Sequence, residues 1–302
     1  MDPDDDRPST SVVELTVDDA DVDVASGELW AAGAVAVGEV DEGGRTVLRA
    51  ATADGDPAPL VAAVRAWGPR ATGGPPEIRT VAVAAEEGLD AWRAHARSWR
   101  AGRHLVVTAP WVDGPAASGT SAADDDDVVL AIDPGHAFGS GSHVSTRLAL
   151  AALEPRVAPG ASVADVGCGS GVLGIAAARL GAARVRAADV DPAAVAATQA
   201  NAERNGVADR VAVALGSVGA VGRGHDLVAA NLLAPVLRAL GPELAAALGP
   251  DGRLVLAGLL AGQVDGVVAA TGLIVVDRLD DEGWTALVLA AGAPGSGAPL
   301  SG

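Results

Sequence analysis

The sequence predicts an α/β protein: a doubly wound, seven-stranded sheet preceded by a small ferredoxin-like α+β domain. Three observations support this prediction. Residues 163–191 read as a buried strand, a glycine turn, an amphipathic helix and a second strand ending in acid, which make one βαβ unit. Strand and helix patterns alternate over residues 128–290. Upstream, residues 12–84 follow the order β-α-β-β-α-β.

Composition narrows the class of protein. The chain has 302 residues, 49% of them hydrophobic, which is enough for a sizeable core in two domains. No apolar run reaches the ~18 residues of a membrane span, and the start M-D-P-D-D-D is not that of a secretion signal. The single cysteine, Cys168, excludes an internal disulfide and suits a reducing compartment. We therefore expect a cytoplasmic protein without a membrane partner.

The charge of the chain constrains its partners. The net charge is -18, and all 21 basic residues are arginine. An acidic surface repels phosphate backbones, and the sequence has no dense basic patch, so we expect no direct nucleic-acid partner. A basic protein partner would be attracted. We also expect a monomer.

The first domain is expected at residues 1–85. A polar tail comes first, and patterns of alternation and helical spacing follow. The predicted elements are a strand at 12–17, a helix at 22–32, a hairpin of 34–40 and 45–50 around Glu42-Gly43-Gly44, a helix at 60–67 and a strand at 78–84. By itself this order indicates a binding or supporting module.

Residues 86–127 are expected to connect the two domains. Apolar residues at helical spacing from Leu89 to Trp99 predict a connecting helix whose tryptophans pack, in preference to a ligand-stacking site. A strand follows at 105–108. Residues 113–127 are rich in Gly, Ser, Ala and Asp and end in four acids, which predicts a solvated loop. Adjacent carboxylates in such a loop lack the fixed geometry of a metal site.

A strand at 128–132 leads into D-P-G-H-A-F-G-S-G-S-H-V-S-T, and a helix begins near Ser145. This stretch holds the only phenylalanine of the chain, Phe138, and a run of hydroxyl groups, so it can cover a cofactor and reach it. His136 and His143 have no third ligand at a short fixed spacing. We therefore predict no metal site.

The glycine turn predicts a site for an adenosine-containing cofactor. Gly167, Gly169 and Gly171 let the chain turn tightly and let a ligand touch the backbone. Asp189 closes the second strand about 20 residues later, at the distance expected of a ribose-binding acid. Asp191 competes for this role, but the pair Asp191-Pro192 is typical of a helix start.

Two neighbours of the turn refine the cofactor prediction. Val172 stands where a dehydrogenase motif has its third glycine, so the spacing argues against a dinucleotide. Asp165 precedes Gly167 by two residues and is expected near the methionine end of S-adenosyl-L-methionine.

The remaining elements complete the sheet. An apolar run at 227–230 ends at Asn231, which places a carboxamide at the carboxyl end of the fourth strand, where open α/β sheets keep their active sites. A turn-forming role is the alternative for Asn231. The last two strands have no helix between them, so the final strand should be antiparallel. The predicted elements are helices at 193–205, 236–248 and 263–270, strands at 211–215, 254–257, 273–277 and 284–289, a turn at 249–252 and a flexible tail at 291–302.

Several motifs occur together in residues 128–290: D-P-G-H-A-F-G-S-G-S-H-V-S-T, D-V-G-C-G-S-G, A-A-D-V-D-P, N-L-L-A, G-L-L-A-G-Q and E-G-W-T-A-L-V-L. With them the chain resembles the bacterial methyltransferases of ribosomal protein L11, the PrmA type. The resemblance implies a class I methyltransferase domain, S-adenosyl-L-methionine as cofactor, and cofactor contacts at Thr146, Gly167, Asp189 and Asn231. It also implies that residues 1–85 recognise the ribosomal protein.

The chain departs from the family pattern at three points. Serines replace both threonines of the usual G-T-G-T, which keeps the hydroxyl groups. The usual glutamate-tryptophan pair is split as Glu282-Gly283-Trp284, and the chain has no tyrosine. Any family tyrosine near the substrate is therefore absent.

The resemblance implies methyl transfer to amino groups, on lysine side chains or the N-terminus, of a basic ribosomal protein. A lysine amine has a reference pKa of about 10.4, so the site must favour the neutral amine. No side-chain base is evident, and we expect catalysis by proximity and orientation, with the Asn231 carbonyl oxygen holding the amine. Two alternatives stay open: a methyltransferase of another protein or of a small-molecule amine, and a non-catalytic S-adenosylmethionine-binding assembly factor. Nucleic-acid methylation ranks last, because N-L-L-A lacks the aromatic residue that stacks on a flipped base.

Overall fold

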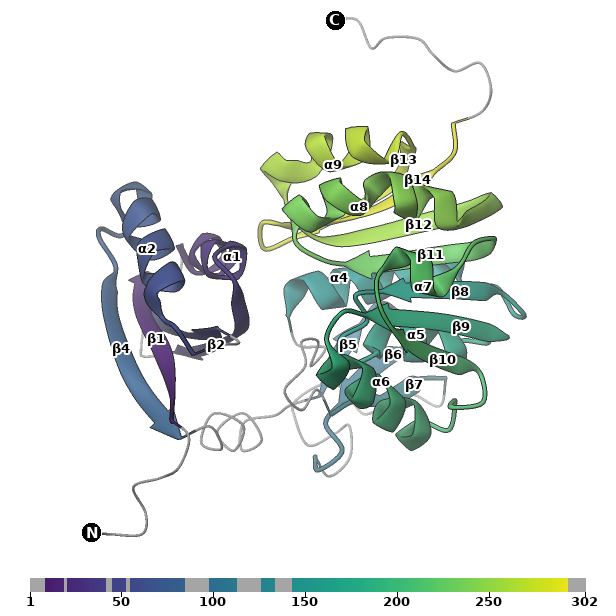
Figure 1. Ribbon diagram of the computed structural model, residues 1–302, viewed down its shortest axis with the longest axis horizontal. Helices are drawn as coiled ribbons and strands as arrows, with labels where there is room; N and C mark the ends of the chain where they lie inside the picture. Colours follow the sequence, from purple (N-terminus) through teal and green to yellow (C-terminus); the bar gives the residue numbers. More distant parts are fainter. Residues whose placement is uncertain are drawn as a thin grey trace, which may run out of the picture. The chain divides into compact units, whose positions relative to one another are not determined.

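The structure, a computed structural model, describes residues 9–18, 21–41, 45–52, 55–84, 98–112, 126–133 and 143–292 (Figure 1). The chain divides into two compact units, residues 1–95 and 96–302, and each is described by itself. No helix in these described ranges is both long and apolar enough to span a membrane. Several predicted features lie outside the described residues: residues 1–8 of the polar tail, the turn at 42–44, residues 89–97 of the connecting helix, residues 113–125 of the acidic segment, His136, Phe138, and residues 293–302 of the C-terminal tail.

In its described residues, the first unit is a four-stranded antiparallel sheet with two α-helices. The strand order is β2-β3-β1-β4, as the ferredoxin-like prediction requires. The elements are β1 (Ser9–Asp18), α1 (Val22–Ala31), β2 (Ala34–Asp41), β3 (Arg45–Thr52), α2 (Ala58–Trp67), the 3-10 helix η2 (Gly68–Arg70) and β4 (Glu77–Ala84).

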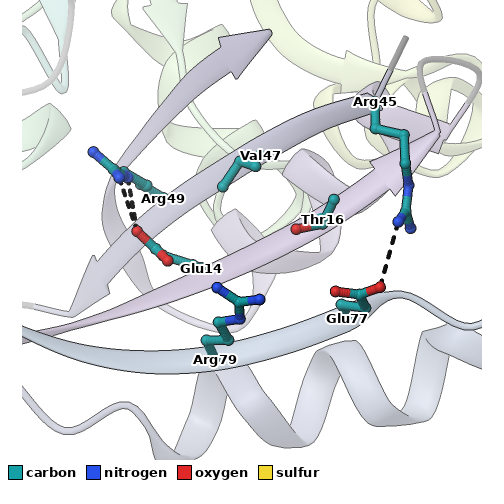
Figure 2. A pocket seen from close by; sticks show the side chains of 7 residues that line it. All are labelled: Glu14, Thr16, Arg45, Val47, Arg49, Glu77 and Arg79. Carbon is teal, nitrogen blue, oxygen red and sulfur yellow. Dashed lines mark hydrogen bonds and ion pairs between the residues drawn. The ribbon is translucent and has the colours of Figure 1, made fainter. Parts of the chain in front are cut away.

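The strands of this first sheet are buried on one face only. Val13 and Leu15 of β1 are fully buried, whereas Glu14 and Thr16, which alternate with them along the strand, lie on the opposite, open face (Figure 2). Alternate residues of a strand point to opposite faces, so the sequence V-V-E-L-T-V produces this division directly.

A three-stranded sheet opens the described part of the second unit. It consists of β5 (Trp99–Ala101), β6 (Leu105–Thr108) and β7 (Val128–Ala131), in the order β5-β6-β7. The prediction that Trp99 ends a helix is wrong, because Trp99 pairs with Val107 in an antiparallel ladder. Pairing with a strand further along the chain outweighs the local helical spacing here.

Asp127 also differs from its prediction as part of a solvated loop. Arg100 donates two hydrogen bonds to its carboxylate, at 2.8 and 2.6 Å. The Asp127 side chain is only 1% exposed. A bidentate pair of this kind fixes geometry as well as charge, so the end of the acidic segment is anchored to β5.

The second unit is built on a seven-stranded sheet in the order β10-β9-β8-β11-β12-β14-β13. Strand β14 is antiparallel to both of its neighbours, and the other pairs are parallel. The predicted seven-stranded sheet with an antiparallel final strand is therefore confirmed. The elements are α4 (Val144–Leu153), η4 (Glu154–Arg156), β8 (Ser162–Val166), α5 (Val172–Arg179), β9 (Arg184–Asp189), α6 (Pro192–Arg204), β10 (Val211–Leu215), α7 (Val218–Val221), β11 (His225–Asn231), α8 (Ala234–Ala247), β12 (Leu248–Leu260), η5 (Ala261–Gln263), α9 (Val264–Thr271), β13 (Ile274–Asp281) and β14 (Trp284–Ala290).

The centre of this sheet is buried on both faces. Leu227 and Ala229 of β11 belong to one hydrophobic cluster, and Val228 and Ala230 belong to the other. Helix α5 contributes to the first cluster and α8 to the second, as the helices on the two faces of the sheet show (Figure 1). Such double coverage explains why these strands read as continuous apolar runs.

Two details of the second sheet were not predicted. The predicted turn at 249–252 lies inside β12. The register shifts there, because His225 of β11 pairs with Leu248 and Leu227 pairs with Arg253. These four residues form an irregular insertion at the start of a strand, because their neighbours on both sides pair with β11. The short helix α7 has too few residues to show a periodic pattern in the sequence.

Candidate active site

The turn between β8 and α5 is the first part of the site. Gly167, Gly169 and Gly171 have φ angles of 69°, 53° and 82°, a left-handed backbone that other residues rarely adopt. A Cβ atom on Gly167 would lie 2.4 Å from Cδ2 of Leu232, and one on Gly171 would lie 2.8 Å from Cγ2 of Thr198. Backbone shape and crowding therefore both require glycine in this turn.

Asp189 at the end of β9 lies against this turn. Its Oδ2 accepts a hydrogen bond from the Gly169 N–H at 2.9 Å, and its Oδ1 accepts one from the Asp191 N–H at 3.0 Å. The Asp191 side chain instead caps α6, because its Oδ1 accepts from the Ala193 N–H at 2.8 Å. Asp191 thus has the helix-start role expected of it, and Asp189 is the acid beside the glycines.

Asn231, the last residue of β11, meets the first turn of α4. Its Nδ2 donates to Oγ1 of Thr146 at 3.2 Å, and Thr146 is only 1% exposed. A Cβ atom on Gly258 of β12 would lie 3.1 Å from Oδ1 of Asn231. Since Nδ2 is engaged by Thr146, Oδ1 is the acceptor that Asn231 has left within the described part of the chain.

Asp165 on β8 is buried, with an exposed fraction of 1%. Its Oδ2 accepts from the Gly174 N–H at 2.8 Å, while its Oδ1 has no hydrogen-bond partner among the described residues. Burial raises the pKa of this carboxyl group to about 7; the Gly174 hydrogen bond opposes the rise, and the charge of Asp189 adds to it. A buried carboxyl group whose second oxygen has no partner among the described residues can accept a hydrogen bond from a ligand or from another part of the chain.

The structure brings most of the predicted site residues to neighbouring strand ends. Asp165 lies near the end of β8, Gly167 and Gly169 follow β8, Asp189 ends β9, and Asn231 ends β11, which pairs with β8. Thr146 joins them through Asn231. Phe138 is outside the described residues, so its predicted cofactor contact stays a prediction.

Known proteins are similar to this chain in both sequence and fold. The chain matches the family described as Ribosomal protein L11 methyltransferase (PrmA) over residues 47–291. It belongs to that family. A relative named Ribosomal protein L11 methyltransferase from Pelotomaculum thermopropionicum is 45% identical over 214 residues, which are 70% of this chain and 67% of the relative. One of the same name from Chloroflexus aurantiacus is 40% identical over 239 residues, 70% of this chain and 71% of the relative.

A solved structure agrees with this membership. The crystal structure of a ribosomal protein L11 methylase from Lactobacillus delbrueckii subsp. bulgaricus is 30% identical, with a TM-score of 0.57. The match covers 65% of this chain and 98% of that chain. The family resemblance read from the motifs is confirmed, and so is the class I methyltransferase fold.

His143 has a structural role at the start of α4. It is the N-cap residue, and its Nδ1 accepts from the Ser145 N–H at 3.2 Å. Its ring meets the edge of the Trp284 ring at 4.8 Å between centroids. Burial, and then the charge of Arg147, lower the pKa of His143 to about 4, so the imidazole is neutral at physiological pH. No group of three or more His, Cys, Asp or Glu side chains that could hold a metal occurs among the residues described.

The split Glu-Gly-Trp segment still contacts α4. Trp284 packs against His143, and Glu282 pairs with Arg147 at 3.3 Å. The inserted Gly283 has a φ of 79°, so the turn between β13 and β14 accommodates it. The departure from the family pattern therefore keeps both side chains beside the helix that carries Thr146.

Sequence reasoning missed the polar face of α6. Thr198, Asn201 and Asn205 are buried and bonded to the segments around the glycine turn and β7. The available signal was the spacing of three and four residues in T-Q-A-N-A-E-R-N, which puts polar groups on the side of the helix that faces the sheet.

Proposed function

We propose that the protein transfers the methyl group of S-adenosyl-L-methionine to amino groups of ribosomal protein L11, on lysine side chains, the N-terminus or both. The relatives are named for methylation of that protein. The observation that carries the proposal is the bonded pair Asn231–Thr146 at the strand end next to the glycine turn. Open α/β sheets bind their ligands at these carboxyl ends. The proposal places the activity in the cytoplasm and assigns it to a monomer.

The residues at these strand ends fit the cofactor. The glycine turn leaves its backbone open to a ligand, Asp189 would accept from the ribose hydroxyls, and the unpaired Oδ1 of Asp165 would accept from an ammonium group. When bound, the cofactor supplies an electrophilic methyl group on a sulfonium centre. Two carboxylates near the turn suit the positive charge of that cofactor.

Asn231 would position the amine. Its Nδ2 is held by Thr146, so Oδ1 would accept a hydrogen bond from the amino group and orient its lone pair. A lysine amine has a reference pKa of about 10.4, and a desolvated site favours its neutral form. The neutral His143 is too weak a base to help, because its pKa is about 4. The chemistry proposed is therefore orientation and desolvation, without a general base from the residues that the structure describes.

The first unit would select the protein substrate through the open face of its sheet. Glu14 pairs with Arg49 at 2.9 Å and Arg45 with Glu77 at 3.4 Å, and Figure 2 shows Arg79 between the two pairs. These charges come from β1, β3 and β4 and surround a pocket of about 200 Å³. A surface of mixed charge suits another protein surface, where complementarity gives specificity.

The central experiment is incubation of the purified protein with labelled S-adenosyl-L-methionine and purified L11, followed by mass mapping. The proposal expects labelled methyl groups on amines of L11. Label on a different protein, or none on any protein, would overturn it. Labelling of small amines alone would instead favour a small-molecule methyltransferase.

Substitution on the open face separates substrate choice from catalysis. Glu77→Arg is expected to raise the KM for L11 about tenfold, because it replaces an acid on this face with a cation that repels a basic substrate. The KM for the cofactor should not change. Equal methylation of L11 by both forms would contradict the role proposed for this face.

A further inference from the structure

Helix α6 and its C-cap residue, Asn205, carry three polar side chains on the buried side. Thr198 and Asn201 are 0% exposed, and Asn205 is 8% exposed. A spacing of three and then four residues places them on one face of the helix, where a helix packed on a sheet normally has apolar residues. Buried polar groups are tolerated when hydrogen bonds replace their water. The role of each side chain therefore depends on which segments supply its hydrogen-bond partners.

The Asn201 carboxamide joins two segments that lie far apart in the sequence. Its Nδ2 donates to the carbonyl oxygen of Ser170 at 2.9 Å and to that of Asp133 at 2.8 Å. Its Oδ1 accepts from the Asp133 N–H at 3.0 Å and from the Arg204 guanidinium. Ser170 belongs to the glycine turn, and Asp133 follows β7. The two ends of one amide thus tie the turn to the chain that leaves β7.

The glycine turn is held from two sides. On the α6 side, Oγ1 of Thr198 donates to the Gly169 carbonyl at 2.9 Å, beside the bond from Asn201 to Ser170. On the other side, the Gly169 N–H donates to Asp189 at 2.9 Å. Glycine has wide conformational freedom, so glycine residues alone do not fix the shape of a turn. Here the side chains of α6 and β9 fix it.

Asn205, the C-cap residue of the same helix, offers a matched reference. Its Oδ1 accepts from the Ala131 N–H at 2.9 Å, and its Nδ2 donates to the carbonyl oxygens of Ala131 and Asn201, both at 2.8 Å. It has the same side-chain chemistry as Asn201 and also bonds to the β7 segment. None of its hydrogen bonds among the described residues reaches the glycine turn.

We propose that Asn201 is a positioning residue for methyl transfer, which holds the cofactor-binding turn in its working shape by tying Ser170 to the end of β7. The proposal rests on the proposed function, because it takes the glycine turn as the site of S-adenosyl-L-methionine. Loss of the Asn201 amide frees the Ser170 peptide group, and the turn then samples shapes that do not fit the cofactor. The effect falls on cofactor affinity and on the KM for the cofactor, whereas the KM for L11 stays the same.

The test compares Asn201→Ala with Asn205→Ala in the full-length chain. Thermal unfolding measures the loss of stability, calorimetry measures the affinity for S-adenosyl-L-methionine, and steady-state methylation of L11 gives both KM values and kcat. We expect both variants to lower the melting temperature. Asn201→Ala alone should weaken cofactor affinity, by about tenfold or more, with kcat at saturating cofactor little changed.

Three further variants, at Asn201 and at Thr198, keep the test decisive if Asn201→Ala fails to fold. Asn201→Asp is nearly isosteric, keeps the acceptor for the Asp133 N–H and removes both donors, so it should lose affinity as well. Thr198→Val should weaken cofactor affinity because it removes the hydrogen bond to the Gly169 carbonyl. Thr198→Ser keeps the hydroxyl group and should retain the wild-type affinity.

The outcomes distinguish this inference from the proposed function. If the wild-type protein binds the cofactor and methylates L11, but the Asn201 and Asn205 variants have equal cofactor affinity, only the role of Asn201 is overturned. A wild-type protein that does not bind S-adenosyl-L-methionine would overturn the proposed function, and the inference with it.

Discussion

We call the side of the seven-stranded sheet where its parallel strands begin the amino edge, and the side where they end the carboxyl edge. Both carry buried polar residues, but the residues at the two sides have different hydrogen-bond partners. At the amino edge, Oγ of Ser162 lies 3.0 Å from Nδ1 of His225, and Nε2 of His225 lies 3.1 Å from the Val221 carbonyl oxygen. The Ser162 N–H donates to Oδ2 of Asp226. Each of these groups has a partner from the fold itself. At the carboxyl edge, Oδ1 of Asp165 has none among the described residues, and Oδ1 of Asn231 remains an acceptor.

Under the proposed function, we interpret the paired groups as structural and those with a remaining acceptor as ligand-binding. A buried polar network that is fully paired stabilises the fold. A buried group left with bonding capacity costs free energy, and it is retained where a ligand completes it. Two predictions pair a change at the carboxyl edge with a change at the amino edge, and two follow Asp165 at the carboxyl edge as the pH changes.

The largest effect is expected at the glycines. Gly167→Ala should weaken cofactor affinity by about a hundredfold or more, because its left-handed φ of 69° is strained for alanine and its Cβ would lie 2.4 Å from Leu232. Gly160, before β8, has a φ of 84°, and a Cβ atom there would meet nothing within 4 Å among the described residues. Gly160→Ala should therefore cost about 1–2 kcal/mol of stability and leave binding intact. Calorimetric titration and thermal unfolding of both variants measure this contrast, and equal affinities would break it.

The next effect concerns Asn231. Asn231→Ala should lower kcat for methylation of L11 by about a hundredfold through loss of the amine acceptor, with little change in melting temperature. His225→Ala should do the reverse, lowering the free energy of unfolding by about 1–3 kcal/mol because Ser162 and the Val221 carbonyl lose their partner. A His225 variant with impaired kcat, or an Asn231 variant with full kcat, would show that the edges do not divide the work in this way.

The smallest effect is a pH dependence at Asp165. Its pKa is raised to about 7, and a cationic cofactor binds the ionised form better, so cofactor affinity should fall by about fivefold as the pH drops from about 7 to about 6. Asp189 faces the same turn with its own charge, while burial raises the pKa of the Cys168 thiol and keeps it neutral. Asp165→Asn should bind more weakly and with a flat pH profile.

Stability should follow the same group with the opposite sign. The pKa of an aspartate in the unfolded chain is 3.8 and that of Asp165 in the folded protein is about 7, so folding favours its protonated form. That contribution is complete below the lower value and is lost as the pH rises through the higher one. The melting temperature of Asp165→Asn relative to wild type should therefore increase between about pH 5 and about pH 8. A constant difference over that interval would mean that Asp165 does not titrate there.

The parts of the site that sequence predicted are those that local signals specify. Glycines at alternate positions, an acid at a strand end and the N-cap of α6 are all encoded within a few residues, and the structure has them where the pattern puts them. Asn231 is predictable because an apolar run ends there, and the carboxyl ends of parallel strands meet at one edge.

What escaped prediction depends on partners that are distant in the chain. Trp99 lies in a strand because β6 pairs with it, and Asp127 is buried because Arg100 binds it. The role of Asn201 depends on Asp133, 68 residues away. No local periodicity carries that information, since each residue keeps an ordinary propensity for its own element.

The contact between Leu232 and Gly167 has a consequence for how this family can change over time. Cδ2 of Leu232 occupies the space next to the α-carbon of Gly167, although the two belong to different motifs. A side chain at position 167 would require Leu232 to move, so we expect the glycine motif and the N-L-L-A motif to covary across relatives as one coupled pair. Their substitutions should also be non-additive in a double-mutant cycle, because each single change alters the space that the other needs.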